Sequence, residues 1–510
     1  MPKELPGFYY DAEKNRYFPL KGPIPGSSRP SSSTNNTAKT SSQPVQASNS
    51  CRRTRVRISK LLQGRELNGD IINFNKGKHS FVEELLKAQA SQPMVWKYQG
   101  TQKQGDGALD QMRINILTPE GQTQVDVLIT GSRSGSLSLF EVGKVGQHFD
   151  NGVKCIPDRV RPVVGEIKAE CRKPPLDIWR PSGASLQMPS SISSIKPFVK
   201  QSPYADNSFT IQHALITTLG SETSGGSVCI LNLIEPLDLY SRTPLRQSMR
   251  EITSFNCTIW TADFNQNSNQ VVIGTNLGAA LINLETGTRT WMCRSKSDVL
   301  AQQLDQSGNV VLCGLRNGAI LTVDVRENRE GFSARLIRHR IPHSTLGKFH
   351  QNSSKQWFEV RGNVYPSCTF YMPSSICSLV SLRSYDQYFL ASSMDGSIKL
   401  YDHRMTKGEL QSYEGNVNSH SRLQLAVDQS ERFLMAGGED CNLRLWSIKS
   451  GELLYEEKVS DSVLSTGCWQ RSERYVRLQD ERYEEFQSGQ HNSWGAWCGS
   501  QEGLFYVHWS

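Results

Sequence analysis

Two stretches of this chain, 78 positions apart, have almost the same pattern. Residues 311–326 read VLCGLRNGAILTVDVR, and residues 389–404 read FLASSMDGSIKLYDHR. Each is an apolar run, then Asn-Gly or Asp-Gly, then an alternating run that ends in Asp-x-Arg. The Asn-Gly and Asp-Gly pairs supply the positive φ angles that a tight hairpin turn needs. A recurring hairpin predicts a fold built by repetition of one unit.

The same hairpin template matches the sequence seven times. The turn residues Gly278 and Gly318 are 40 positions apart, and Gly396 and Cys441 are 45 apart, which fits the period of about 40–45 residues in WD40 blades. Outer strands are expected at 289–294, 334–338 and 453–458, and inner strands at 299–304, 376–382 and 423–427. Four strands in each of seven units predict an all-β, seven-bladed WD40-type β-propeller; a six-bladed ring is the alternative, because the second match is weak. The matches are residues 127–140, 214–233, 271–284, 311–326, 389–404, 433–446 and 497–507.

Only three strands can be drawn for the last unit before Ser510, so another strand must cover its open edge. Residues 94–98 (MVWKY) are expected to close the ring, and the first blade is expected to begin near 112–117. The propeller is then assigned to 93–510, after a helical linker at 61–92 and a tail at 1–60. Polar, irregular insertions are expected at 172–207 and 327–372.

Charge distinguishes the tail from the propeller. Residues 1–60 hold 11 Lys and Arg against 3 Asp and Glu, which leaves 46 of each sign in residues 61–510. A neutral propeller gives nucleic acid no bulk electrostatic attraction, so nucleic acid is an unlikely main partner. The Ser- and Pro-rich stretch 21–50 predicts disorder. The basic run at 52–60 is either a nuclear-import or phosphate-contacting arm or a solvated linker.

Two islands in the first 92 residues have a pattern of their own. Residues 4–20 (ELPGFYYDAEKNRYFPL) predict a tight aromatic hairpin, which is equally well interpreted as a docking motif or as a clasp on the propeller. A short helix is expected at 81–88, with Ser80 as N-cap and Glu83 completing a capping box. Its apolar face, made of Phe81, Leu85 and Val82, is expected to pack against the propeller. The aromatic residues of the first island are Phe8, Tyr9, Tyr10, Tyr17 and Phe18.

Several functional classes find no support in the sequence. The 12 cysteines form no Cys-x-x-Cys pair, so no zinc site is expected, and buried reduced thiols indicate a reducing compartment, nuclear or cytoplasmic. No secretory or membrane-spanning segment is recognised. Because no nucleophile, phosphate-loop or metal-ligand motif is found, an enzyme is the least favoured class, and no cofactor or metal is expected.

The Asp-x-Arg endings predict a more specific feature. Alternation along the strand places the Asp and the Arg on the same side, at the rim of the propeller. The carboxylate can then hold the guanidinium, which projects a rigid set of hydrogen-bond donors. Because no other repeat lies between the two copies, Arg326 and Arg404 are expected on neighbouring blades, as one two-point contact for a partner.

These endings resemble the WDxR box of WD40-repeat substrate receptors in cullin-4 RING ubiquitin ligases. His403 departs from the aliphatic position of the box, and the other copy has Asn317 for the Asp and Val323 for the aromatic residue. Together with the ELPGFYYDAEKNRYF motif and the SDVLAQQ motif at 297–303, the chain resembles the family of damaged-DNA-binding-protein and cullin-4 associated factors. The residues that match the box are Ser392, Ser393, Asp395, Ile398, Leu400, Tyr401, Asp402 and Arg404, with Ile320, Asp324, Val325 and Arg326 in the other copy.

The resemblance implies that the chain is a non-catalytic, substrate-recruiting subunit. One face would bind the adaptor, damaged-DNA-binding protein one, in the cullin-4 complex, while the other face or the tail holds an unknown substrate protein. An N-terminal helix such as 81–88 could also contact the adaptor. The alternatives are a WD40 scaffold in another complex and a chromatin- or RNA-associated propeller that uses its basic tail. The residues implied in adaptor binding are Asp324, Arg326, Tyr401, Asp402 and Arg404.

Overall fold

The computed structural model forms two compact units, residues 1–48 and 49–510. The stretch 21–50 and most of the basic run at 52–60 lie outside the described residues. The structure describes residues 8–11, 16–19, 58–69, 71–74, 77–118, 121–145, 152–162, 174–198, 213–221, 224–238, 244–265, 269–326, 337–340, 357–362, 364–365, 368–406, 408–470 and 494–509.

The described part of the first unit is a two-stranded antiparallel hairpin. Strand β1 (Phe8–Asp11) pairs with β2 (Arg16–Pro19), and Tyr10 lies opposite Tyr17. The tight hairpin predicted from residues 4–20 is therefore confirmed. Its role, as a docking motif or as a clasp, stays a prediction.

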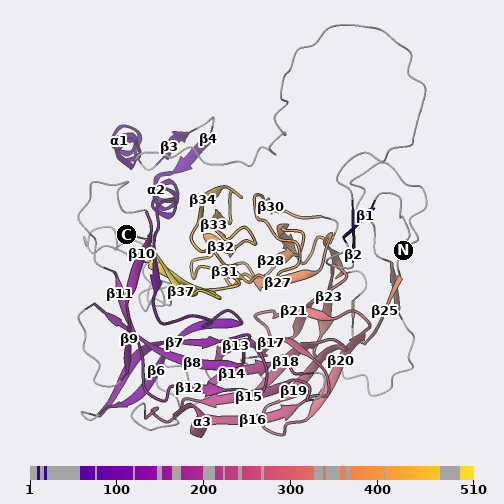
Figure 1. Cartoon of the computed structure of the whole chain (residues 1–510). Coiled ribbons are helices and arrows are strands. Elements are labelled where there is room, and N and C mark those ends of the chain that lie inside the picture. Colours follow the sequence, from indigo (N-terminus) through magenta and orange to yellow (C-terminus); the bar gives the residue numbers. More distant parts are fainter. Residues whose placement is uncertain are drawn as a thin grey trace, which may run out of the picture. The chain divides into compact units, whose positions relative to one another are not determined.

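The described part of the second unit contains seven blade sheets that follow one another along the chain (Figure 1), besides the small β3–β4 sheet described below. The first three blades have these strands. Blade one contains β6 (Ala108–Thr118), β7 (Gly121–Gly131), β8 (Ser136–Lys144), β11 (Leu176–Arg180) and β9 (Val153–Cys155), with β12 (Ser185–Gln187) beside β8. Blade two contains β13 (Ile192–Phe198), β14 (His213–Thr218), β15 (Ser227–Asn232) and β16 (Met249–Ser254). The short helix α3 (Pro244–Ser248) lies between β15 and β16. Blade three contains β17 (Ile259–Asn265), β18 (Gln270–Thr275), β19 (Gly278–Asn283), β20 (Arg289–Ser295), β25 (Trp357–Gly362) and β24 (Ile337–Arg340).

The other four blades follow the same order of strands. Blade four contains β21 (Val299–Leu304), β22 (Val310–Leu315), β23 (Ala319–Asp324) and β26 (Phe370–Tyr371). Blade five contains β27 (Ile376–Ser381), β28 (Tyr388–Ser393), β29 (Ile398–Asp402) and β30 (Gln411–Tyr413). Blade six contains β31 (Leu425–Val427), β32 (Phe433–Gly437), β33 (Asn442–Ser447) and β34 (Leu453–Lys458). Blade seven contains β35 (Thr466–Trp469), β36 (Trp494–Ser500), β37 (Gly503–Trp509), β5 (Met94–Tyr98) and β10 (Pro157–Arg161).

The seven sheets form a closed ring. The inner strands β6, β13, β17, β21, β27, β31 and β35 contact one another in that order, and β35 also contacts β6. Apolar residues of neighbouring blades share common core clusters, as alternating side chains on the two faces of a sheet require. The predicted seven-bladed β-propeller is confirmed, and each of the seven predicted hairpins forms the second and third strands of one blade.

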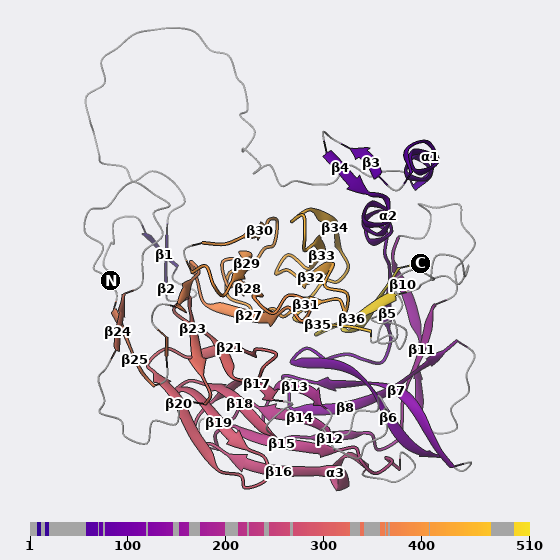
Figure 2. The same cartoon turned by 180° about the vertical axis from the view of Figure 1, so that it is seen from behind.

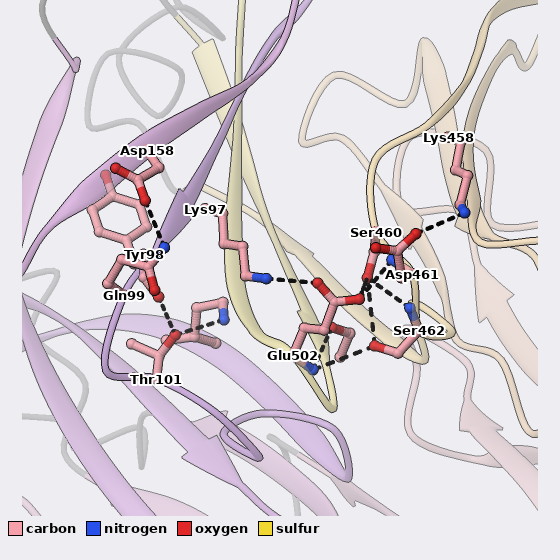
Figure 3. Close-up of polar contacts among 12 residues, drawn as sticks. Lys97, Tyr98, Gln99, Thr101, Asp158, Lys458, Ser460, Asp461, Ser462 and Glu502 are labelled. Carbon is pink, nitrogen blue, oxygen red and sulfur yellow. Dashed lines mark hydrogen bonds and ion pairs between the residues drawn. The ribbon is translucent and has the colours of Figure 1, made fainter.

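The ring closes with the strand that the sequence predicted. β5 pairs antiparallel with β37, with Trp96 opposite Tyr506, and in Figure 2 the yellow C-terminal strands lie beside β5. Figure 3 shows a polar network at this junction, centred on Glu502. The Glu502 carboxylate accepts a hydrogen bond from Lys97 Nζ at 2.6 Å and another from the backbone N–H of Asp461 at 2.6 Å. These bonds tie the closing strand, blade seven and blade six together.

Two strand predictions were wrong. The segment 334–338 was expected as the outer strand of blade four, but that place is taken by β26. The described strand nearest to it, β24, pairs with β25, which extends the edge of blade three through β20. The stretch 172–207, expected to be irregular, contains β11 and the inner strand β13. Both errors concern strands inside stretches that the sequence analysis assigned to polar insertions.

Residues 58–90 form a small helical element at the start of the second unit. It contains α1 (Ile58–Asn68), β3 (Ile71–Phe74), β4 (Gly77–Ser80) and α2 (Phe81–Ala90). Ser80 is the N-cap of α2 but makes no side-chain capping bond, and Glu83 Oε1 instead accepts a bond from Lys449 Nζ at 2.5 Å. The predicted capping box is therefore wrong.

The two sides of α2 contact different partners. The predicted apolar face, including Phe81, packs with Leu61 of α1 and not with the propeller. The propeller is contacted from the other side, where Trp509 Nε1 donates to Ala90 O at 2.9 Å and Lys87 Nζ lies 3.3 Å from Glu452 Oε2. The helix thus joins α1 to blades six and seven (Figures 1 and 2).

Candidate partner-binding rim

The topology of a blade defines two faces of the ring. Because neighbouring strands are antiparallel, the first strand begins where the turn between the second and third strands lies, and the third strand ends at the opposite face. We call the first the turn face and the second the box face. The segments 324–326 and 402–404 follow the third strands of blades four and five, so both lie on the box face.

Each Asp-x-Arg pair forms the same compact fork. Asp324 Oδ1 accepts the backbone N–H of Arg326 at 2.8 Å and its Nε–H at 3.1 Å, while Nη2 donates to Asp324 Oδ2 at 2.8 Å. The corresponding distances between Arg404 and Asp402 are 2.8, 3.0 and 2.7 Å. Two parallel charge-assisted bonds fix the plane of each guanidinium.

The two residues of each pair differ in solvent exposure. The side chains of Arg326 and Arg404 are each 67% exposed, whereas those of Asp324 and Asp402 are 5% exposed. The side-chain hydrogen bond from the arginine lowers the pKa of each carboxyl below its usual value, against the opposing effect of burial. Both aspartates are therefore ionised at neutral pH, and each presents an oriented guanidinium to solvent.

The same turn without an arginine occurs in two other blades. Asn232 Oδ1 accepts the backbone N–H of Ile234 at 3.2 Å in blade two, and Asn283 Oδ1 accepts that of Glu285 at 2.8 Å in blade three. In blade six the place of the arginine is held by Lys449, which bonds to Glu83 of α2. The Asp or Asn thus forms the turn, and the exposed arginine is the added feature of blades four and five.

The two arginines belong to neighbouring blades, as predicted. The inner strands β21 and β27 are in contact, and Gln306 Nε2 of blade four donates to Leu382 O of blade five at 3.3 Å. Asp305, in the loop after β21, lies close enough to Arg326 and to His403 for its charge to act on both. We call Asp324, Arg326, Asp402 and Arg404 the box rim.

Tyr401 has a different position from the rest of the implied adaptor site. It is 3% exposed, and its ring stacks on Phe389 with centroids 5.4 Å apart and packs against Phe370 of blade four. A partner cannot contact this ring while the blades remain packed. Tyr401 is therefore a core residue that holds the end of β29, and the expectation of direct contact is corrected.

Sequence reasoning missed one member of the site. Tyr365 Oη donates to Asp324 Oδ2 at 3.1 Å, so the carboxylate of blade four is held from a second direction. Tyr365 lies 41 positions away in the insertion, and no local pattern indicates the contact.

The helical element of residues 58–90 also reaches the box face. It leads into β5, whose first residue, Met94, pairs with His508 near the end of β37. Its helix α1 exposes the side chains of Leu62 and Leu67.

The remaining predictions about the site have these outcomes. The five aromatic residues of the tail motif lie in the separate first unit, where the hairpin backbone is what the structure describes. In the part of the chain that is described, no group of three or more His, Cys, Asp or Glu side chains could hold a metal ion. No helix there has the length and apolar character to cross a membrane.

Comparison with known proteins gives a consistent result. Residues 354–461 match the DDB1- and CUL4-associated factor 4 beta-propeller domain. The DDB1- and CUL4-associated factor 4 of Bos taurus is 25% identical over 477 residues, which cover 88% of this chain and 78% of that protein. The human protein of the same name is 29% identical over 48% of this chain and 42% of its own length. WD repeat-containing protein 21 of Schizosaccharomyces pombe is 26% identical over 37% of this chain and 38% of its own length. The resemblance expected from the boxes is thereby confirmed: this chain is a WD-repeat β-propeller protein similar to the DDB1- and CUL4-associated factor 4 proteins.

Proposed function

We propose that this chain is the substrate-recruiting subunit of a cullin-4 RING ubiquitin ligase. It binds the adaptor DDB1 through the box rim, and it supplies binding and orientation while the other subunits bring the ubiquitin-conjugating enzyme. The association of its relatives with DDB1 and CUL4, as their names state, supports the complex. The protein acts in the nucleus or the cytoplasm, where cullin ligases and reduced thiols occur together.

The observation that carries the adaptor contact is the repeated fork on adjacent blades. Two guanidinium groups with the same geometry and the same exposure of 67% lie on one face. Arginine is enriched among interface hot spots because its fixed donors can bond a partner's carbonyl or carboxylate groups at several points. The carboxylates beneath them hold the donors in place before the partner arrives, which reduces the entropy lost on binding.

The test compares affinity for purified DDB1 between the intact chain and the double variant Arg326→Ala, Arg404→Ala. We expect at least about a hundredfold weaker binding, since loss of one engaged hot-spot arginine commonly weakens binding by about tenfold or more. Arg316→Ala is the matched control. Arg316 belongs to blade four, is 56% exposed and pairs with Asp298 at 2.8 Å, but it lies in the turn between β22 and β23 on the turn face.

A second double variant tests the contribution of the negative charge while it keeps the backbone turn. Asp324→Asn with Asp402→Asn keeps the turn, as Asn232 and Asn283 do in blades two and three, but weakens the hold on the guanidinium. Its loss of affinity should be smaller than that of the double arginine variant. Equal affinity of the double arginine variant and Arg316→Ala for DDB1 would refute the contact.

One observation favours the second candidate, a WD40 scaffold in another complex. The turn at the end of the third strand occurs in blades that lack the arginine, so the aspartates have a structural use without any partner. Failure of the intact, folded chain to bind DDB1 would favour this scaffold function.

A further inference from the structure

A cavity of about 750 Å³ runs through the middle of the ring. It is lined by residues from the inner strands of all seven blades, which is the arrangement that a closed propeller produces. Most of its charged groups have partners. Arg113 Nε donates to Asp126 Oδ1 at 2.9 Å, and Asp263 Oδ2 accepts the backbone N–H of Leu304 at 2.7 Å.

Arg422 lines this cavity and lacks such a partner among the described residues. Its Nε is buried and has no hydrogen-bond partner among the described residues. Burial lowers the pKa of Arg422 to about 10, and the positive charge of Arg133 acts in the same direction. The guanidinium is nevertheless charged at neutral pH, and no carboxylate in the described part of the chain forms an ion pair with it. Arg422 is partly exposed, but a cation whose Nε is buried without a partner or a counter-charge is still costly.

Gln302 adds a second unsatisfied group in the same cavity. It lies on β21, is 4% exposed, and neither its Nε2 nor its Oε1 has a hydrogen-bond partner in the described structure. Buried amides normally have partners, so each exception calls for a water molecule or a ligand. The cavity therefore offers one cationic donor group and one neutral amide whose hydrogen bonds are unfilled.

Arg422 and the nearby Arg133 lie away from the box rim. Arg422 precedes β31, and Arg133 is in the turn between β7 and β8, so both lie at the turn face. Arg133 is exposed, and its charge adds to that of Arg422 at this end of the cavity. An anion entering here meets positive potential from both arginines.

We propose that the central cavity is a carboxylate-binding site that opens at the turn face, formed by Arg422 and Gln302 and favoured by the nearby positive charge of Arg133, and that it receives an acidic side chain or the terminal carboxylate of a partner peptide. A carboxylate bonds well to a guanidinium, and it supplies the missing counter-charge. The identification of this peptide as part of a ligase substrate rests on the proposed function. The carboxylate chemistry does not, and a peptide bound here leaves the box face free for an adaptor.

The test uses the full chain and three fluorescein-labelled probes built on one Gly-Ser sequence. The first carries three consecutive glutamates and an amidated end, the second carries three glutamines and a free C-terminal carboxylate, and the third carries three glutamines and an amidated end. Fluorescence anisotropy at about 0.1 M salt measures binding. Tighter binding of the first probe identifies a side-chain carboxylate, and tighter binding of the second identifies a chain terminus. We expect at least a tenfold preference for one of them over the third.

Arg422→Gln should remove at least tenfold of that affinity. Arg316→Gln is the control, because Arg316 also lies at the turn face but does not line the cavity. The favoured probe should also raise the Tm of the intact chain and not that of Arg422→Gln, since binding to the native state stabilises it. Equal binding of all three probes, or unchanged affinity in Arg422→Gln, would mean that water alone satisfies these groups.

The same variants keep the two proposals distinguishable. Arg422→Gln should bind DDB1 like the intact chain, and the double arginine variant of the box rim should bind the favoured probe like the intact chain. Carboxylate binding without DDB1 binding would refute the ligase function and leave the cavity site standing. The reverse result would refute the cavity site alone.

Discussion

Glu141 gives a pH-dependent stability that can be calculated from the structure. It lies on β8, is 4% exposed, and its Oε2 is buried without a hydrogen-bond partner in the described residues. Burial raises the pKa of this carboxyl from 4.5 to about 7. Because ionisation is harder in the folded state than in the unfolded state, the folded protein loses stability as the pH rises from 4.5 to about 7. Below 4.5 both states are protonated and the loss is absent.

The size of this effect follows from the two pKa values. The interval between 4.5 and about 7, at about 1.4 kcal/mol per pH unit, corresponds to about 3 kcal/mol above pH 7. A domain of about 400 residues has an unfolding entropy near 0.8 kcal/mol/K, so the corresponding change in Tm is about 4 °C if it unfolds as one unit. Glu141→Gln removes the titration, and any fixed cost of the new amide is the same at every pH.

The measurement is the difference in Tm between Glu141→Gln and the intact chain, followed from pH 5 to pH 8.5 in buffers of matched ionic strength. The Tm of the variant, measured relative to the Tm of the intact chain, should rise by about 3 °C over this range, with most of the rise below pH 7.5. A difference that stays constant with pH would refute the reasoning, whatever its sign, because it would show that Glu141 does not titrate abnormally.

Two further predictions concern packing. The side chain of Arg444 is 2% exposed and lies between Asp440 and Glu456. Arg444→Met should lower the free energy of unfolding by about 3–5 kcal/mol, because it leaves two partly buried carboxylates unpaired. The triple variant Arg444→Met, Asp440→Asn, Glu456→Gln should lose less stability in urea unfolding, and an equal or larger loss would contradict this reasoning. Lys449→Ala breaks an exposed ion pair with Glu83 and should lower the free energy of unfolding by less than about 1 kcal/mol. Trp509→Ala should lower it by about 3–5 kcal/mol, because Trp509 stacks on Trp469 and Trp494 and donates a hydrogen bond to Ala90. Similar unfolding midpoints for these two variants would show that the exposed pair matters more than the stack.

The features that sequence reasoning predicted correctly are those whose causes are local. Asn317-Gly318 and Asp395-Gly396 specify a turn within four residues, and Gly318 and Gly396 both have φ near +85° (85° and 86°). The forks of the box rim could be predicted for the same reason, because the Asp and the Arg are two positions apart. Even the closing strand was predictable, since an open sheet edge in the last blade required one more strand.

The features that were missed depend on partners far away in the sequence. β24 and β25 could not be assigned, because they extend the edge of blade three from inside the insertion of blade four. The role of Glu83 was misread because its partner, Lys449, lies 366 positions away. Arg422 and Gln302 line the same cavity only after the ring has closed, and no local pattern links the two.

The box rim also shows how a structural turn can carry a binding group. In blades two to five an Asp or Asn at the end of the third strand accepts the backbone N–H two residues later, so a side-chain oxygen closes the turn at that place in all four. The residue that donates this N–H projects from the box face, and its side chain can vary without disturbing the turn. Blades four and five place arginine there, and the aspartates they use instead of asparagine add the charge that orients it. Because strand direction fixes the box face opposite the turn face, two partners, one held at each face, would lie at opposite ends of the cavity and would not compete for the same surface.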